Sequence, residues 1–395
     1  MSAQSQSVPP LIGSYEGGAA RNAASAKPSL VRQRKDHLPA LSGMRAFSAM
    51  NIVFFHFFNP QWFGPFAPIV NSGYTSVSFF LLLSGFVLAY NYSDRAQRGQ
   101  LKTRNFWIAR VSRLYPMYLV ALLVSVGMLM AEWHARSHAE FAWGVILTPL
   151  MLQGWSPTLS TFWNTPAWTM STEAFFYLIF PLVVLWKRPK HLGKLVAILI
   201  GLWCLGMVLP SLYVWFHPDG VLHANRYTDG FWIRALKFTP PPHIPSFLFG
   251  MVLADVDALI PRAGRQRMLL AAVGITGVVG MLYFGNHFPF PLMHDGLLMP
   301  MFGMMVLGLA GHNLIARFFG LAPLVAVGQA SYCLYILHFN LWDLIHNHHV
   351  VARLGLARFD PWLSYVVLVL LAILAMKYIE RPAQKAIKKR FGLAG

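Results

Sequence analysis

An arginine and a histidine share one side of the first apolar segment of the chain. Arg45 and His56 are eleven positions apart, which in an α-helix is about three turns plus 20°, so both point to one side about 16 Å apart along the axis. A guanidinium binds phosphate bidentately, and an imidazole can take a proton from a hydroxyl near neutral pH. The spacing therefore predicts a channel with a phosphate-binding end and a basic end. The alternative is that Arg45 only anchors the topology, with its guanidinium snorkelling to the membrane surface, and that His56 is a packing residue.

Two further arginines stand where a polar segment enters an apolar one. Arg110 and Arg113 lie in the run from Phe106 to Pro116, which also contains Tyr115. Three positions apart, they share a helix face. Anchoring of a cytoplasmic loop explains them almost as well as binding of a donor that carries phosphates.

Glu173 is the acidic residue that we place deepest inside an apolar segment. Tyr177 follows one turn later on the same face, and Trp168 and Ser171 precede it. A carboxylate at membrane depth needs a cationic or hydrogen-bonding partner. We expect that partner to be Arg45 or His56, and we favour a site role for Glu173 over a purely structural ion pair.

A polar stripe runs along another apolar segment, where Ser331, Tyr335 and His338 have the spacing i, i+4, i+7. Such a stripe either holds helices together or lines the same cavity. The remaining histidine clusters lack carboxylate or thiolate neighbours, and the chain has only two cysteines. We therefore expect no metal site.

The composition indicates which elements must position these residues. Of the 395 residues, 56% are hydrophobic and only 12% are charged, against about a quarter in soluble domains. A spanning helix needs about 20 mainly apolar residues. The sequence therefore predicts an all-α, polytopic membrane protein with about ten transmembrane helices, at roughly 44–60, 73–92, 112–131, 166–186, 195–216, 244–260, 268–286, 295–313, 322–342 and 361–380.

The basic residues predict the orientation of these spans. With the N-terminus inside, all but six of the 32 lysines and arginines fall on the cytoplasmic side, and the C-terminus returns there; such a bias is the usual topology signal. They form short clusters without the continuous basic face of a nucleic-acid module, so we expect no nucleic acid partner. The six outer residues are Arg136, Arg226, Arg234, Lys237, Arg353 and Arg358.

The same patterns divide the chain into three parts. We expect a disordered basic cytoplasmic tail over 1–42, a transmembrane domain over 43–382 and a basic cytoplasmic tail over 383–395. Residues 132–165 contain an apolar stretch too short to span, which predicts an interfacial or re-entrant helix on the outer face. No internal repeat is visible, which weakens a transporter hypothesis.

Several motifs, taken in order, resemble those of the acyltransferase 3 family of integral-membrane acyltransferases. The resemblance covers about residues 38 to 385. One difference concerns Glu173, which is followed by Ala174 where many members have a second acidic residue. The motifs are the run from Arg45 to His56, Ser84-Gly85-Phe86-Val87-Leu88, the run from Phe106 to Pro116, Trp168-Thr169-Met170-Ser171-Thr172-Glu173, the run from Ser331 to His338, and Glu380-Arg381-Pro382.

The resemblance implies ten core helices and transfer of an acyl group, usually acetyl from acetyl-CoA, to a hydroxyl of a carbohydrate or other glycosylated acceptor. It also implies that Arg45 and His56 are essential. We expect an O-acyltransferase of the bacterial inner membrane that modifies an exopolysaccharide, a lipopolysaccharide or a lipid-linked precursor. Its partners would be acyl-CoA, the glycan, membrane lipid and polysaccharide-assembly proteins, with no bound cofactor.

In the mechanism that we expect, His56 is the base and Glu173 orients it, while Arg45 holds the donor. The sequence does not choose between direct transfer and a transient acyl-enzyme. Two other hypotheses stay open: a proton-coupled exporter with His56, Glu173 and His338 as relay, and an acyltransferase for an intracellular macrolide-like metabolite. The further donor-binding residues are Arg110, Arg113, Ser84 and Tyr115, and the cavity lining is Trp168, Ser171, Tyr177, Ser331, Tyr335 and His338.

Overall fold

The computed structural model describes residues 37–57 and 59–393. In these residues every regular element is a helix, apart from one isolated bridge between Ala263 and His312. The first helix, α1, begins at Pro39, four residues before the boundary that we expected. Most of the expected disordered tail over 1–42 lies outside the described residues.

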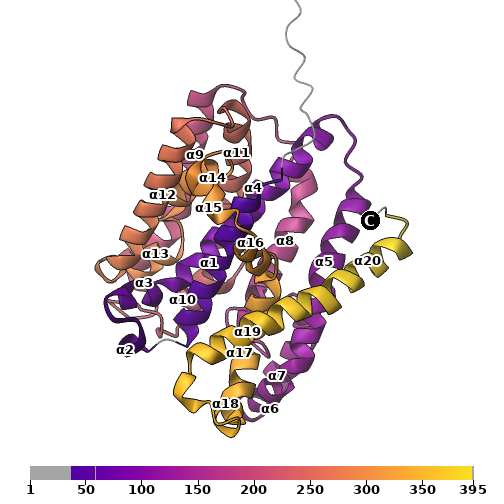
Figure 1. The fold of residues 1–395 in the computed structure, drawn as a ribbon, viewed down its shortest axis with the longest axis vertical. Coiled ribbons are helices and arrows are strands. Elements are labelled where there is room, and N and C mark those ends of the chain that lie inside the picture. Colours follow the sequence, from indigo (N-terminus) through magenta and orange to yellow (C-terminus); the bar gives the residue numbers. More distant parts are fainter. Residues whose placement is uncertain (1–36, 58, 394–395) are drawn as a thin grey trace, which may run out of the picture. The chain divides into compact units, whose positions relative to one another are not determined.

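A helix or helix pair coincides with each of the ten apolar segments (Figure 1). One of them is interrupted, because α16 leads into α17 with a bend of 63°. Another, at 295–313, is preceded by the short α13, which leads into α14. The elements are α1 (Pro39–His56), α4 (Ser76–Gln97), α5 (Thr103–Val124), α8 (Trp168–Val183), α9 (Leu192–Phe216), α11 (Ile244–Leu259), α12 (Arg265–Tyr283), α13 (Phe290–His294) with α14 (Met299–Leu309), α16 (Ala322–Gln329) with α17 (Ser331–Asn347), and α19 (Trp362–Ala375).

Fewer than ten of these helices could cross a membrane by length and composition alone. Among the described residues six qualify, or seven when the bent pair α16–α17 is counted as one span. Helices α8 and α11 have 16 residues each, or about 24 Å, which is short of the hydrocarbon thickness of about 30 Å. Helix α1 is long enough at 18 residues but contains Arg45, Asn51 and His56. The expected count of ten is therefore not reached on this criterion.

Short elements connect the long helices at the end of the bundle where α1 finishes, the end that the charge pattern predicts to be outer (Figure 1). The segment that we expected to be interfacial or re-entrant forms α7 and a short turn, Gln153–Trp155, that packs on the start of α8. Gln153 is fully buried and donates to the Ala167 carbonyl at 3.0 Å. The short helices are α2 (Pro60–Phe63), α3 (Ala67–Asn71), α6 (Val126–Ala135), α7 (His138–Leu147), α10 (Phe231–Phe238) and α18 (Val350–Arg353).

Glycines set the closest helix contacts. A Cβ on Gly85 of α4 would lie 2.0 Å from the Phe247 carbonyl oxygen of α11, and one on Gly250 would lie 1.9 Å from that of Leu82. Helix α1 crosses α16 in the same way, because a Cβ on Gly328 would meet the Ser42 carbonyl oxygen at 1.6 Å. Small residues let helix backbones approach this closely in membranes. These contacts fix α1 and α4 side by side with the helices that complete the site.

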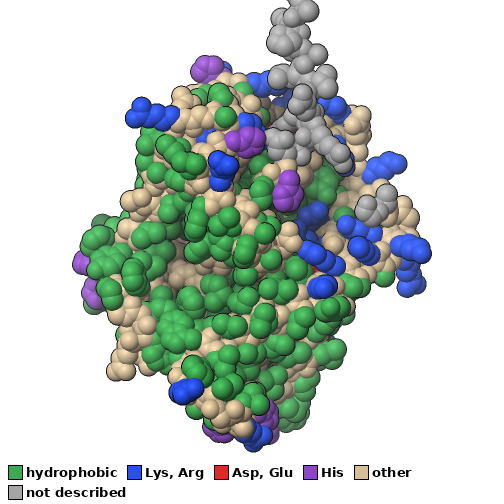
Figure 2. Space-filling view, viewed as in Figure 1, with side chains coloured by type: hydrophobic (Ala, Val, Ile, Leu, Met, Phe, Trp, Pro, Cys, Tyr) green, Lys and Arg blue, Asp and Glu red, His purple; other side chains and the backbone are tan. Residues whose placement is uncertain are grey.

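The C-terminal segment is helical to residue 390. Helix α19 continues through a π-helical turn, Met376–Glu380, into α20 (Arg381–Arg390), which packs along α5. The expected tail boundary at 382/383 thus lies inside a helix. Figure 2 shows Lys and Arg side chains near α20, while hydrophobic side chains cover the middle of this face.

Candidate active site

The half-buried Arg45 of α1 lies in a cluster of charged side chains toward the start of that helix. It interacts electrostatically with Arg113 of α5 and Glu173 of α8. The Tyr177 hydroxyl donates to Glu173 Oε2 at 3.4 Å. Of the two partners that we expected for Glu173, the structure thus places Arg45 beside it.

Glu380 joins this cluster from the π-helical turn. It is buried, interacts with Arg45 and Arg113, and accepts a bond from Cys333 Sγ at 3.0 Å. Sequence reasoning did not assign Glu380 to the site, although the motif Glu380-Arg381-Pro382 was the signal that could have done so. Two carboxylates therefore balance two guanidinium groups here.

Arg110 is held differently from Arg113, although both are on α5. Its Nη2 donates to the Tyr92 hydroxyl at 3.0 Å, and its guanidinium carbon lies 5.5 Å from the Tyr92 ring and 5.9 Å from the Tyr177 ring. Ser84 also interacts with Tyr177. The half-buried Tyr115 packs near Tyr118, with ring centroids 6.4 Å apart.

A pair of imidazoles lies at the other end of α1. The ring centroids of His56 and His338 are 5.1 Å apart. His338 is fully buried; its Nδ1 lies 2.6 Å from the Tyr335 carbonyl oxygen, and its Nε2 has no partner among the described residues. A proton on Nδ1 bonded to that carbonyl leaves a lone pair on Nε2. His338 can therefore accept a proton or a hydrogen bond from a substrate group beside His56.

His56 also has a charged neighbour, Arg226, from the segment after α9. Arg226 Nη2 donates to the Phe55 carbonyl at 2.8 Å, and the guanidinium lies 3.7 Å from the Phe55 ring centroid. Glu173, which we expected to orient His56, lies instead with Arg45 and Arg113. Sequence reasoning treated Arg226 only as an outer-loop cation, and no signal in its segment pointed to His56.

The polar stripe on α17 is buried throughout. Ser331 Oγ has no partner among the described residues, and Tyr335 interacts with Thr169 of α8. Beside His338, Asn164 donates to the Ile336 carbonyl at 3.2 Å and accepts from Asn340 at the same distance. The stripe thus extends between the two ends of the site.

Two residues expected in the lining contact other elements. Ser171 Oγ accepts from the Gly154 backbone N–H at 3.1 Å, and the Trp168 ring packs on His243 with centroids 5.4 Å apart. His243 belongs to a buried group that sequence reasoning missed: its Nδ1 lies 2.8 Å from Asp295 Oδ1, and His294 Nδ1 lies 3.2 Å from Asp295 Oδ2. Nothing in the sequence joins residues 243 and 295.

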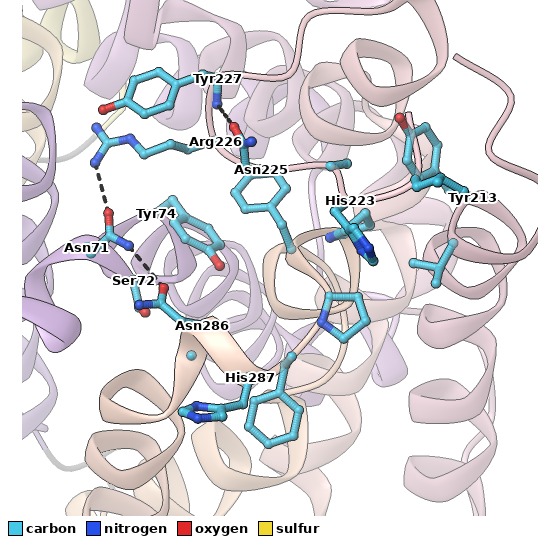
Figure 3. Close-up of a pocket in the computed structure, with 18 of the residues that line it drawn as sticks. Asn71, Ser72, Tyr74, Tyr213, His223, Asn225, Arg226, Tyr227, Asn286 and His287 are labelled. Atoms are coloured by element: carbon cyan, nitrogen blue, oxygen red, sulfur yellow. Dashed lines mark hydrogen bonds between the residues drawn. The ribbon is translucent and has the colours of Figure 1, made fainter. Parts of the chain in front are cut away.

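A pocket of about 840 Å³ opens at the same end as His56 (Figure 3). Its lining comes from the connection between α1 and α4, the end of α9 with the segment after it, and the connection between α12 and α13. Asn71 links two of these walls, because it accepts from Arg226 at 3.4 Å and donates to Asn286 at 3.2 Å. Three connections that we predicted to be outer therefore meet around one cavity.

Comparison with known proteins assigns the class. The acyltransferase 3 family, described as an acyltransferase domain, matches residues 38–380. The chain belongs to this family, as the motifs indicated, and with its apolar helices it is a membrane O-acyltransferase.

Two relatives illustrate the family. The acyltransferase MdmB of Streptomyces mycarofaciens is 28% identical over 81% of this chain and 83% of its own length. The O-acetyltransferase OatA of Staphylococcus aureus is 21% identical over 90% of this chain, which spans 58% of that relative. No solved structure matches the chain.

Proposed function

We propose that this protein transfers an acetyl group from acetyl-CoA to a hydroxyl of a cell-surface polysaccharide or its lipid-linked precursor, in a bacterial inner membrane. One observation carries the proposal: α1 joins an arginine cluster around Arg45 to a pair of imidazoles at His56. A donor that carries phosphates and an acceptor that carries a hydroxyl can thus meet along one helix from opposite ends. A relative named as an O-acetyltransferase supports the acetyl group.

The proposed chemistry needs positioning and a base more than leaving-group activation. The acceptor oxygen attacks the thioester carbonyl carbon, the carbon–sulfur bond breaks, and CoA leaves as thiolate. His56 takes the hydroxyl proton, and His338 beside it can share that proton. The rate acceleration comes from orientation of the two reactants and from a desolvated base.

The donor side of the proposal rests on the charged cluster. Arg45 and Arg113 would contact phosphates, and their carboxylate neighbours Glu173 and Glu380 would hold both guanidinium groups in place until the donor binds. Ser84 and Tyr115 complete this side, and Arg110 holds α5 in place beside it. The proposed lining between the two ends is Tyr177, Ser331, Tyr335 and His338.

The proposal includes the topology and the partners. All ten helical segments cross the membrane, and both termini are cytoplasmic. The glycan is an exopolysaccharide or a lipopolysaccharide unit, and polysaccharide-assembly proteins act with the enzyme. The proposal needs no metal and no bound cofactor.

The test measures transfer of radiolabelled acetyl from acetyl-CoA to the glycan fraction of membranes without an ion gradient, which an ion-coupled exporter would not perform. We expect wild-type protein to label the glycan and His56→Ala to accumulate normally but transfer less than about 1% of that amount, since losing a general base costs about 10²–10⁴-fold. His138→Ala, at an exposed position, is the matched control. Normal transfer by His56→Ala would remove His56 from the base role.

A further inference from the structure

The pocket beside His56 has the lining of a carbohydrate site. Its volume of about 840 Å³ falls within the roughly 300–1,000 Å³ usual for ligand sites. Its polar lining consists of three side-chain amides, three histidines, Arg226, Ser72 and the tyrosine hydroxyls. Aromatic rings form much of its apolar wall, and no Asp or Glu is among its lining residues. Amides pair with hydroxyls in both directions, and aromatic faces suit the apolar faces of sugars. The residues that serve these roles are Asn71, Asn225, Asn286, Tyr74, Tyr213 and Tyr227.

Arg226 connects this pocket to the imidazole pair. It lines the pocket, and its Nη2 is bonded to the Phe55 carbonyl, one residue before His56. It interacts electrostatically with His56 and with Tyr74. Asn71 Oδ1 accepts a hydrogen bond from Arg226 Nη1 at 3.4 Å. Among the described residues no carboxylate pairs with Arg226. An unneutralised guanidinium therefore stands between the cavity and the proposed base.

A buried polar group makes the wall behind the pocket rigid. The rings of Tyr74 and Phe290, both in the pocket lining, pack on His294 at 5.8 and 5.7 Å. Asp295 bridges His294 to His243, and His243 Nε2 lies 3.1 Å from the Lys237 carbonyl oxygen. Both ring nitrogens of His243 thus face acceptors. Buried networks of ion pairs and hydrogen bonds of this kind hold a binding wall in one geometry.

We propose that this pocket binds the acceptor glycan, and that Arg226 holds the reacting sugar against His56. The inference rests on the proposed function and adds the acceptor's place of binding. The acceptor then approaches from the end of the bundle opposite the arginine cluster, so donor and acceptor have separate sites. The His243–Asp295–His294 group positions Tyr74 and does not touch the acceptor.

The kinetic test separates the two substrates. Purified protein in vesicles receives radiolabelled acetyl-CoA and the glycan fraction extracted from membranes of a strain lacking the gene. Arg226→Met and the pocket-filling change Asn286→Trp, at an exposed rim position, should raise the apparent KM for the glycan by about tenfold or more. The KM for acetyl-CoA should stay within about twofold. His138→Trp, exposed but outside the lining, should change neither constant.

A second measurement does not depend on transfer. Asn286→Cys, in a background with Cys204→Ala, is labelled with a membrane-impermeant maleimide in the absence of acetyl-CoA. We expect the glycan fraction to slow labelling at least about threefold, and His138→Cys to be unaffected. Equal labelling rates with and without glycan, or an unchanged glycan KM in both pocket variants, would overturn the pocket assignment. Absence of transfer by wild type with protection at residue 286 would instead overturn the proposed function alone.

Asp295→Asn tests the positioning role. A carboxylate has two oxygens and can accept one N–H hydrogen bond from each histidine. An asparagine has one acceptor oxygen and one NH2 donor, so it cannot accept from both in the same way. We expect a raised glycan KM with kcat reduced less than threefold in protein that accumulates normally. A loss of kcat with unchanged KM would give the buried group a direct role in the chemistry and would contradict the positioning assignment.

Discussion

Arg110 and Arg113 lie one turn apart on α5, yet different neighbours hold their guanidinium groups. Arg113 interacts with Tyr177, Glu173 and Glu380. Arg110 lies mainly among the rings of Tyr92, Phe106 and Tyr177 and donates to the Tyr92 hydroxyl, and its interaction with Glu173 is weaker than that of Arg113. A cation among carboxylates can exchange one acceptor for a phosphate. A cation among aromatic rings keeps the helices in place whether or not a donor is bound.

We therefore expect the two arginines to respond differently to substitution. Arg113→Gln removes charge-assisted contacts worth about 1.5–3 kcal/mol and should raise the KM for acetyl-CoA about tenfold or more, with the glycan KM unchanged. Arg110→Gln should change the donor KM less and lower the melting temperature more. Arg95→Gln, at an exposed position on α4, is the control. If the KM for acetyl-CoA were the same in Arg113→Gln and in wild type, Arg113 would be excluded from the donor site.

Lys237 of α10 makes the free energy of unfolding depend on pH. Burial, and after it the neighbouring Arg234, lower the pKa of Lys237 to about 8 from 10.5. The unfolded chain binds more protons than the folded one between about pH 8 and 10.5, so the contribution of Lys237 to stability rises with pH through that window. Lys237→Met should thus melt higher than wild type at pH 7, and the difference should shrink toward pH 10. A constant difference, or the same result for the exposed Lys187→Met, would contradict the assignment.

At this scale the sequence predicted the neighbours of Arg45 better than it predicted the neighbours of His56. Arg45, Glu173 and Tyr177 come together because helical spacing places them on interior faces, and that spacing is readable. His56 pairs with His338 and Arg226 instead of Glu173, because the helix crossing between α1 and α17 and the path of the segment after α9 decide those contacts. Neither is encoded in the local pattern around His56.

At the scale of elements, close backbone contact places α4 against α11. Gly85 and Gly250 each face a carbonyl oxygen of the opposite helix, so the two form a reciprocal contact. Gly85 belongs to the motif that accompanied the family resemblance, and the contact supplies its physical reason. Phe176 of α8 stacks on Phe247 of α11 at 4.3 Å, so the same contact also supports the helix that carries Glu173.

Gly250→Ala should disrupt this contact. The added Cβ would lie 1.9 Å from the Leu82 carbonyl oxygen, and since backbone atoms border it, relief requires α4 and α11 to separate. Overpacking costs about 1–3 kcal/mol or more, so we expect a lower melting temperature in detergent and a lower transfer rate. Gly280→Ala, where nothing lies within 4 Å of the new Cβ, should match wild type. Equal melting temperatures of the two variants would contradict the close-packing explanation.

Hydropathy located the helices but misplaced several of their ends. Helix α5 begins at Thr103, nine residues before the predicted start, because its first turns are polar and hydropathy does not register them. The bend between α16 and α17 falls inside one apolar run, and the break between α13 and α14 falls at the very start of another, so periodicity alone could not reveal either. Tertiary packing, such as the position of Gly328 against α1, decides where these helices break.

For the whole molecule, the distribution of charge and the lengths of the helices indicate different numbers of membrane crossings. The basic residues favour ten crossings, yet α1, α8 and α11 are too polar or too short to qualify by themselves. All three pack against other helices of the bundle, and those helices bury most of their polar residues at least in part. A short, buried helix can complete a crossing because protein surrounds it in place of lipid.

Cysteine labelling across these three helices tests the ten crossings. In a Cys204→Ala background, a membrane-impermeant maleimide added to intact spheroplasts should label exposed cysteines at 66, 138 and 222, and should label those at 37, 187 and 265 only after permeabilisation. The pairs 37/66, 138/187 and 222/265 flank α1, α8 and α11 respectively. If α8 did not cross, positions 138 and 187 would be labelled from the same side, and the same logic applies to the other pairs. Opposite labelling of each pair would mean that a helix of about 24 Å, made of 16 residues, completes a crossing inside the bundle.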